Sequence, residues 1–446
     1  MITGARLTEA EAEAHVHGIC FKTGPPARVG VELEWLVRDR RDPALPLAAE
    51  RVAAALAGFG AGDDQGYTGQ APGSAQHPPS FPSGALLTME PGGQLELSSA
   101  PTDTLGELHE VTRQDLAVLR DSVAAVGLEL CGSGLDPLRP PQRVLEVPRY
   151  TAMEKFFDRD GPWGRQMMCG TASVQVCLDA GDDSAGQSGY RSRWRLLHAI
   201  GPVLVAAFAN SPLRAGRPTG WRSARQQVWA HLDPGRTRPP ALDASDGDPR
   251  DAWAAYAMDA EVMCVRDPGS ADWAAPPGLT FRDWLRDSGS GTLRAPTAED
   301  LDYHLSTLFP PVRPRGHLEL RMIDAQPGDG WIVPAAVATA LADDEHAADA
   351  ALAAAEPVWG GPARAGPPQD GPADARDPWL RAARSGPADP RIGQASRQCF
   401  EAADAALAKS GAPAPIRLAV ADFTERYVMN DRCPADDQLD GVNGVT

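Results

Sequence analysis

Apolar and polar residues alternate along several short stretches of the chain, and this period of two predicts β-strands. The clearest stretch is 171–179, where apolar residues occupy every second position and polar groups or a thiol fall between them. Because strand side chains alternate between faces, such a segment buries one face and displays the other. Further strands are predicted at 28–37, 94–99, 126–132 and 317–321.

Other stretches carry apolar residues at helical spacing. The pattern is strongest over 103–126, and a helix over 5–20 is expected to begin at Thr8, a residue type that caps helix N-termini. The segment 60–84 is crowded with Gly, Pro, Ser and Gln and predicts a long loop, interpreted as a mobile cover near the functional site. Further helices are predicted at 47–58, 150–158, 191–209, 335–356, 395–409 and 420–430.

The composition of the chain becomes rich in Ala near residue 335, which suggests two regions. Residues 1–335 contain the clear strands and are expected to carry the chemistry. Residues 336–446 are expected to form an Ala-rich helical region packed on the first. Within the second region, the Pro/Gly-rich segment 357–390 predicts a linker or flexible loop.

Three predicted strand segments place Glu on alternate positions, so that the carboxylates project from one face. In the first, the Cα atoms of Glu32 and Glu34 are expected about 7 Å apart, since a strand rises about 3.3 Å per residue. Glu90 precedes the turn before the second strand, Glu96 lies within that strand, and Glu319 lies in the third. Any single acidic strand could be the wet face of an antiparallel sheet.

Three such strands without Lys neighbours favour bound cations instead, because facing carboxylates repel one another. Hard oxygen ligands select Mg²⁺, with Mn²⁺ possible. Mg²⁺ is commonly held by a few carboxylates together with substrate phosphates, so this reading implies a nucleotide or another phosphorylated ligand.

Nine Arg fall between Arg191 and Arg238, and the guanidinium group offers paired donors to phosphate and carboxylate. Most of the nine are expected to lie on helix surfaces and form ion pairs with the excess of acidic residues. Arg225, Arg236 and Arg321 are the candidates for anion contacts. No Walker loop, dinucleotide fingerprint or kinase signature is present, so phosphate binding would depend on metal and Arg.

The 446 residues carry 42 basic and 60 acidic side chains, a net charge of −18, which disfavours nucleic acid and anionic membranes as partners. Without a signal-peptide pattern or a run of 18 apolar residues, a cytoplasmic location is expected. Seven scattered cysteines predict reduced thiols, and neither Cys169 nor Cys177 has an identifiable activating His. His198 is expected in the core, and the oligomeric state is left open.

Six motifs stand out along the chain: Gly30-Val31-Glu32-Leu33-Glu34, Thr88-Met89-Glu90-Pro91-Gly92-Gly93-Gln94-Leu95-Glu96-Leu97-Ser98, Met167-Met168 with 171–179, Asn210-Ser211-Pro212, Asp233-Pro234-Gly235-Arg236-Thr237 and Glu319-Leu320-Arg321. Together they resemble the glutamate-cysteine ligases over roughly residues 28–335, most closely the plant-type branch and its actinobacterial members that supply ergothioneine biosynthesis. The resemblance implies a glutamine-synthetase-like α+β fold, in which a curved, mainly antiparallel sheet is covered by helices and holds ATP and two or three Mg²⁺ ions on a concave acidic face.

The same resemblance implies roles for individual residues. Arg321 and Arg236 would be catalytic contacts to phosphate, and Arg225 would bind the α-carboxylate of glutamate. Gln175 and Thr171 would contact substrate. The metal ligands would be Glu32, Glu34, Glu90, Glu96 and Glu319.

The implied activity is ATP-dependent formation of γ-glutamylcysteine from L-glutamate and L-cysteine through a γ-glutamyl phosphate. Three alternatives stay open at this point. The chain could be a carboxylate-amine ligase of the same fold with a different amine acceptor, a non-catalytic nucleotide-binding protein, or a purely structural acidic protein.

Overall fold

The computed structural model describes residues 7–59, 81–240, 247–267, 269–287, 293–360 and 377–443. Its centre is a seven-stranded sheet in the order β2-β3-β1-β5-β9-β8, with β4 paired to the far end of β1. Neighbouring strands of this sheet run antiparallel. The strands are β1 (Val29–Asp39), β2 (Leu86–Met89), β3 (Leu95–Ser98), β4 (Leu128–Cys131), β5 (Ser173–Asp179), β8 (Val312–Pro314) and β9 (His317–Asp324), and a separate hairpin joins β6 (Leu213–Arg214) to β7 (Arg217–Pro218).

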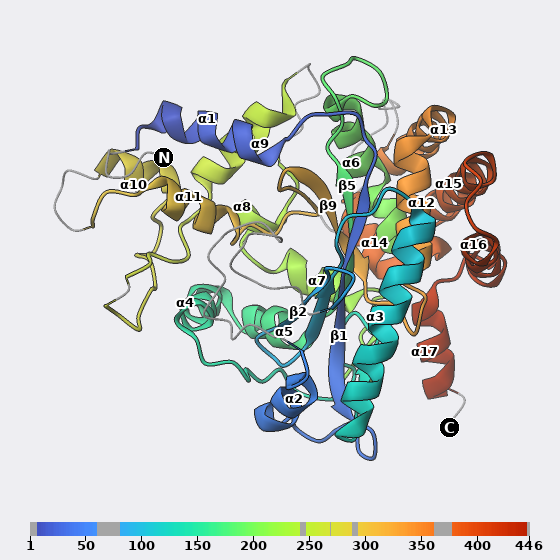
Figure 1. Ribbon diagram of the computed structural model, residues 1–446, viewed down its shortest axis with the longest axis horizontal. Coiled ribbons are helices and arrows are strands. Elements are labelled where there is room, and N and C mark those ends of the chain that lie inside the picture. Colours follow the sequence, from blue (N-terminus) through green and yellow to red (C-terminus); the bar gives the residue numbers. More distant parts are fainter. Residues whose placement is uncertain are drawn as a thin grey trace, which may run out of the picture.

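Helices surround this sheet on both sides. They are α1 (Glu9–Cys20), α2 (Ala49–Leu56), α3 (Leu105–Ala125), α4 (Pro148–Phe157), α5 (Trp163–Gly170), α6 (Tyr190–Ala207), α7 (Ala224–Ala230), α8 (Pro234–Thr237), α9 (Pro249–Asp259), α10 (Phe281–Asp287), α11 (Ala298–Leu305), α12 (Ile332–Asp343), α13 (Glu345–Ala355), α14 (Pro378–Ser385), α15 (Pro390–Lys409), α16 (Ala414–Arg426) and α17 (Pro434–Asn443). Figure 1 shows α3, α12, α13, α15, α16 and α17 on one side of the strands, and α1, α4, α5 and α8 to α11 on the other.

The register of the ladder decides which side chains share a face. Glu32 of β1 lies opposite Ser98 of β3 and Gln175 of β5, and directly opposed residues in a ladder project to the same side. The intervening Val31 and Leu33 project to the other side and are buried in the main core. The alternation in the sequence therefore becomes one apolar face, packed on helices, and one polar face.

A β-bulge in β9 shifts this alternation. Cys177 of β5 pairs with Glu319 and Ser173 pairs with Asp324, so five residue steps in β9 match four in β5. The extra residue in β9 changes the parity of everything that follows it. Asp324 therefore projects to the same face as Glu319, although strict alternation would place it on the opposite one.

The main apolar core is continuous between the sheet and the C-terminal helices. It contains Leu33 of β1 and Val176 of β5 together with Leu204 of α6, Leu341 of α12 and Phe400 of α15, all of them buried. The predicted division between residues 335 and 336 falls inside α12, so it cuts through a helix that packs in this core. The division into two regions stays a prediction.

Most predicted elements are confirmed within a few residues, including the helix that begins after Thr8, where Thr8 and Glu11 form a capping box. The single helix predicted over 335–356 is wrong, because the backbone is extended at Asp344, whose side chain caps α13. The short strands β2 and β8 were not predicted.

The predicted linker at 357–390 is wrong for its second half, which contains α14. Trp379 anchors that helix, since its ring lies so close to Gly201 of α6 that a Cβ at Gly201 would overlap it. The Pro/Gly-rich composition of 357–390 gave no sign of this contact between Trp379 and Gly201. The other part of this linker, at 361–376, and residues 60–80 of the loop interpreted as a cover lie outside the described residues.

The α+β class with an antiparallel sheet is confirmed. His198 is in the core as expected, where its Nδ1 lies 2.9 Å from the Trp194 carbonyl oxygen. All seven cysteines are free thiols. Among the described helices none is long and apolar enough to cross a membrane.

Candidate active site

Four carboxylates from three strands of the sheet project from its polar side, and we call them the acidic face: Glu32 and Glu34 of β1, Glu96 of β3 and Glu319 of β9. Glu34 lies directly opposite Glu96 in the ladder. Glu32 is only 8% exposed and Glu319 is fully buried. Glu34 and Glu96 are half-buried. The face is therefore not a simple wet sheet surface, because Glu is almost never fully buried unless it is paired.

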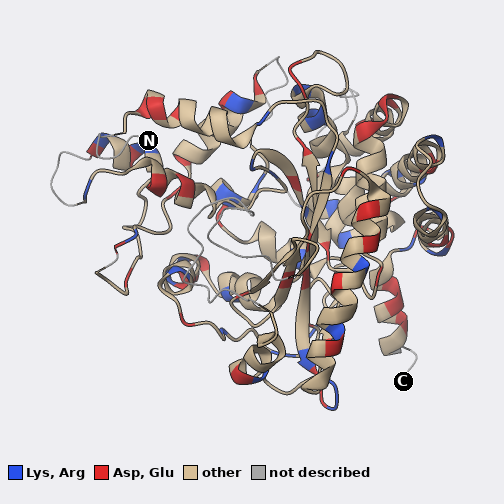
Figure 2. Ribbon diagram, viewed as in Figure 1, with Lys and Arg blue, Asp and Glu red and all other residues tan. Residues whose placement is uncertain are grey.

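The carboxylates of the acidic face repel one another. Burial raises the pKa of Glu96 well above its usual range, and the neighbouring Glu32, Glu90 and Glu34 raise it further. Burial and Glu319 likewise raise the pKa of Glu32. Figure 2 shows these acidic segments on the central strands, in addition to those on the outer helices.

A divalent cation between these groups would relieve that repulsion, so the donor set fits Mg²⁺ in its chemistry. The side-chain positions are not those of a preformed site. Among residues 7–59, 81–240 and the later described segments, no three His, Cys, Asp or Glu side chains converge as metal ligands. Metal binding would therefore require side-chain rotations on the acidic face.

A hydrogen-bonded row of polar groups crosses the sheet beside these carboxylates. Glu34 accepts hydrogen bonds of 3.0 Å from both Ser173 Oγ and Gln175 Nε2. Gln175 in turn accepts from Arg321, and Arg321 also donates to Glu319. The structure thus brings Gln175 and Arg321 together with the predicted metal ligands.

Arg313 of β8 is a member of the site that the sequence analysis missed. It lies opposite Glu319 in the ladder and donates Nε and Nη2 to the two carboxylate oxygens of Glu319, at 3.0 and 2.9 Å. Although burial opposes ionisation, Arg313 and Arg321 hold the pKa of Glu319 well below its usual range. Its signal in the sequence was only a Val-Arg-Pro stretch before the acidic strand.

Arg225 projects from the first turn of α7 and is 2% exposed. Its Nη2 donates to the backbone oxygen of Arg321 at 2.9 Å, and its guanidinium lies over the Trp229 ring, 4.6 Å from the centroid. Nε and Nη1 have no hydrogen-bond partner in the described part of the chain. Burial lowers the pKa of Arg225, while Asp324 and Glu34 act in the opposite direction.

The Arg236 and Thr171 side chains donate to groups outside the acidic face. Arg236 is fully buried, and its guanidinium donates to the Asp233 carboxylate and to the backbone oxygens of Thr307 and Glu261. The Thr171 hydroxyl donates to the Met167 carbonyl oxygen at 2.6 Å. Each side chain is thus engaged in holding neighbouring segments together, and the functional roles expected of both stay predictions.

Glu90 begins the turn between β2 and β3. Its carbonyl accepts from Gly93 N at 2.9 Å, and Gly93 has φ +82°, a conformation that L side chains rarely adopt. A Cβ at Gly92 would overlap the Cys169 carbonyl. Gln94 fixes the turn from the other side, since its Nε2 donates to the Met168 and Thr171 oxygens. The Pro-Gly-Gly-Gln motif therefore shapes the turn that carries Glu90 to its place near Glu96.

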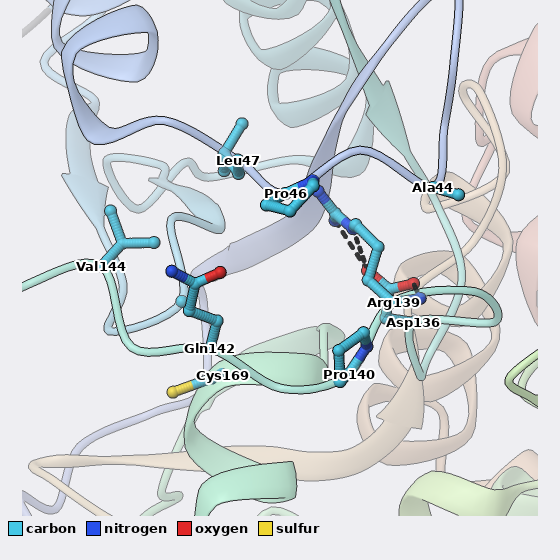
Figure 3. Close-up of a pocket in the computed structure, with 10 residues that line it drawn as sticks. Ala44, Pro46, Leu47, Asp136, Arg139, Pro140, Gln142, Val144 and Cys169 are labelled. Carbon is cyan, nitrogen blue, oxygen red and sulfur yellow. Dashed lines mark hydrogen bonds and ion pairs between the residues drawn. The ribbon is translucent and has the colours of Figure 1, made fainter.

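A small cavity of about 40 Å³ lies beside this turn (Figure 3). Gly92 and Cys169 form part of its wall, together with the ion pair of Asp136 and Arg139, whose atoms approach to 2.6 Å. A cavity of that size holds a few water molecules at most. It does not accommodate a nucleotide, and the acidic face remains the candidate site.

Comparisons with known proteins agree with this site. The glutamate-cysteine ligase family 2 model matches residues 28–437. Glutamate-cysteine ligase EgtA of Mycolicibacterium smegmatis is 38% identical over 98% of this chain and 92% of its own length. EgtA of Mycobacterium tuberculosis strain H37Rv is 39% identical over 98% and 91%, respectively.

More distant relatives share part of the chain or only the fold. The chloroplastic glutamate-cysteine ligase of Medicago truncatula is 32% identical over 54% of this chain and 47% of its own length. A crystal structure of glutamate-cysteine ligase from Francisella tularensis in complex with AMP superposes with a TM-score of 0.52 at 12% identity. That superposition covers 94% of this chain and 85% of the other, and it shows a shared fold.

The family match covers the acidic face, the turn at Glu90 and most of the C-terminal helices, and the two EgtA proteins extend it to nearly the full chain. The resemblance inferred from the acidic strand motifs is confirmed. This chain belongs to the glutamate-cysteine ligase family 2.

Proposed function

We propose that this chain is an ATP-dependent glutamate-cysteine ligase that forms γ-glutamylcysteine from L-glutamate and L-cysteine, for ergothioneine biosynthesis. The observation that carries the proposal is the near-full-length similarity to the two EgtA proteins. The acidic face agrees with it, because clustered carboxylates can hold the Mg²⁺ that accompanies ATP. We also propose a cytoplasmic location, where ATP and reduced thiols are available.

Glu32, Glu34, Glu90 and Glu96 would hold Mg²⁺, or Mn²⁺ in its place. With the metal bound, ATP supplies the phosphoryl group that activates the γ-carboxylate of glutamate for attack by the cysteine amine. Glu96 lies opposite Glu34 in the ladder, and burial together with Glu32, Glu90 and Glu34 raises its pKa. We therefore take Glu96 as the ligand to test first.

Glu319 would bind a metal ion only if at least one of its hydrogen bonds from Arg313 were broken. Both of its oxygens accept from Arg313, so a metal would have to compete with this ion pair. Arg321, which donates to Gln175 and Glu319, would turn toward the transferred phosphoryl group and stabilise its charge. Arg225, whose Nε and Nη1 lack partners in the described segments, would bind the α-carboxylate of glutamate.

The proposal is tested by measuring ADP release with MgATP, glutamate and cysteine, and with each component omitted in turn. We expect release only with the complete mixture. A panel of other amines in place of cysteine tests the alternative acceptor, and ADP release with another amine but not with cysteine would replace the proposal. ATP binding without any glutamate-dependent turnover would favour a non-catalytic protein.

Glu96→Gln should abolish turnover while preserving the fold. Glu110→Gln is the matched control, because Glu110 is an exposed residue of α3 whose side chain accepts hydrogen bonds from Arg113 and Gln114 of the same helix. We expect the control to retain full activity.

A further inference from the structure

Asp324 ends β9 and is 2% exposed, yet the sequence analysis gave it no role. The β-bulge in β9 turns its side chain to the same face as Glu319 and pairs it with Ser173 of β5. Ser173 also donates to Glu34 of the acidic face. Asp324 is therefore a buried carboxylate placed next to the site by the bulge.

The two oxygens of Asp324 have different partners. Oδ2 accepts from the backbone N–H of Asn210 at 2.9 Å and from Ser211 Oγ at 2.7 Å. Oδ1 accepts from Ser223 Oγ at 2.9 Å and lies 3.9 Å from Nη1 of Arg225. One oxygen thus holds the Asn210-Ser211 loop, and the other faces the guanidinium of Arg225.

The two hydroxyls extend this contact to the backbone at the start of α7. Ser211 Oγ accepts from the backbone N–H of Arg225 at 3.1 Å. Ser223 Oγ caps the helix by accepting from the N–H of Gln226 at 3.2 Å. Through these relays Asp324 fixes the backbone that carries Arg225 as well as facing its charged end.

The bulge itself supplies the remaining contacts. The backbone oxygen of Arg321 accepts from Nη2 of Arg225 at 2.9 Å, and the oxygen of Met322 accepts from Nε2 of Gln226 at 2.8 Å. A bulge interrupts ladder pairing and leaves backbone groups for other partners. The first turn of α7 is thereby bound to β9 at the bulge.

These contacts leave Nε and Nη1 of Arg225 without hydrogen-bond partners in the described part of the chain, although the side chain is buried. A buried guanidinium that keeps donor capacity at Nε, while Nη1 faces Asp324, can donate to a carboxylate ligand. We propose that Asp324 is the positioning residue that orients Arg225 for the α-carboxylate of glutamate. The inference rests on the proposed ligase function and deepens it.

Asp324→Asn tests this inference, because it removes the charge while keeping the shape. We expect the KM for glutamate to rise at least about tenfold, while kcat and the KM for ATP and cysteine stay within about twofold, as for a lost substrate contact. Calorimetric titration with glutamate should show the same loss of affinity. Asp300→Asn is the matched control: Asp300 is 5% exposed and also pairs with an Arg and a Thr, but on α11. We expect its KM values to be unchanged.

A second pair of variants separates positioning from general support of the fold. In an Arg225→Ala background, Asp324→Asn should raise the glutamate KM no further, because residues acting as a unit are non-additive. An additional rise in that background, or equal changes in all three KM values, would show a merely structural role and overturn the inference.

If Asp324→Asn does not fold, Ser211→Ala replaces it, with a rise in glutamate KM of about threefold expected. An unchanged glutamate KM overturns the inference while the wild-type activity stands, whereas an inactive wild type overturns the proposed function as well.

Discussion

Arg313 is the residue whose replacement gives the sharpest test of the electrostatics of the site. Its side chain is 5% exposed, that of Glu319 is 0% exposed, and two hydrogen bonds join them. Arg313→Met removes the charge but keeps much of the apolar stem. The variant leaves a fully buried carboxylate that has lost its bidentate partner.

Removing one partner of a buried ion pair costs about 3–5 kcal/mol, because the remaining charge stays desolvated. Arg321 still donates to Glu319, so we expect the lower end, about 3 kcal/mol of the free energy of unfolding. The ion pair of Arg113 and Glu110 is the matched control, since its side chains are 48% and 54% exposed. Arg113→Met should cost less than about 1 kcal/mol.

The assay is equilibrium unfolding in urea without Mg²⁺ at neutral pH. Glu319→Gln in the Arg313→Met background should recover part of the loss, since it neutralises the abandoned carboxylate. The deficit should also shrink on acidification, because protonation of Glu319 removes the same buried charge. A cost for Arg313→Met no larger than that for Arg113→Met, with nothing recovered by Glu319→Gln, would refute this reasoning.

Three further predictions concern pH, the Glu90 turn and metal binding. Burial lowers the pKa of His198 to about 4, so as pH falls from about 6.5 the unfolded chain takes up this proton before the folded chain does. The free energy of unfolding should therefore fall by about 1.4 kcal/mol per pH unit, about 3 kcal/mol in all. His198→Met should remove that part of the slope in urea titrations between about pH 4.5 and 7.5. Gly92→Ala should abolish activity or folding, because its Cβ meets the Cys169 carbonyl, whereas Gly18→Ala in α1, with open space around it, should raise the free energy of unfolding by about 0.5–1 kcal/mol. Mg²⁺ with ATP should raise the thermal unfolding temperature of the wild type and not of Glu96→Gln; an equal shift in both would argue against Glu96 as a ligand.

Local pattern was enough to predict the central strands and several of the helices that cover them. The period of two in β1, β3, β5 and the start of β9 assigned those strands and the faces of Glu32, Glu34, Glu96 and Glu319, because alternation is a property of the strand backbone itself. The capping residue Thr8 and the apolar spacing of α3 were equally local signals. The resemblance to glutamate-cysteine ligases followed from the same short motifs.

Other features depend on contacts between distant segments. The helix α14 forms in a Pro/Gly-rich stretch where Trp379 packs against Gly201 of α6. Arg313 joins the site only because it pairs with Glu319 in the β8–β9 ladder. A strand of three residues is too short for its alternation to predict that pairing from the sequence.

Alternation along the strands assigned the carboxylates to one face, and the short motifs identified the family. Contacts between segments settle that Arg236 and Thr171 donate to neighbouring segments, that Arg225 keeps two buried donors without partners in the described residues, and that Asp324 turns toward the site. The physical reason is that alternation fixes side-chain direction only within an unbroken strand. Register, bulges and the competition for hydrogen bonds are settled between strands and helices far apart in the chain.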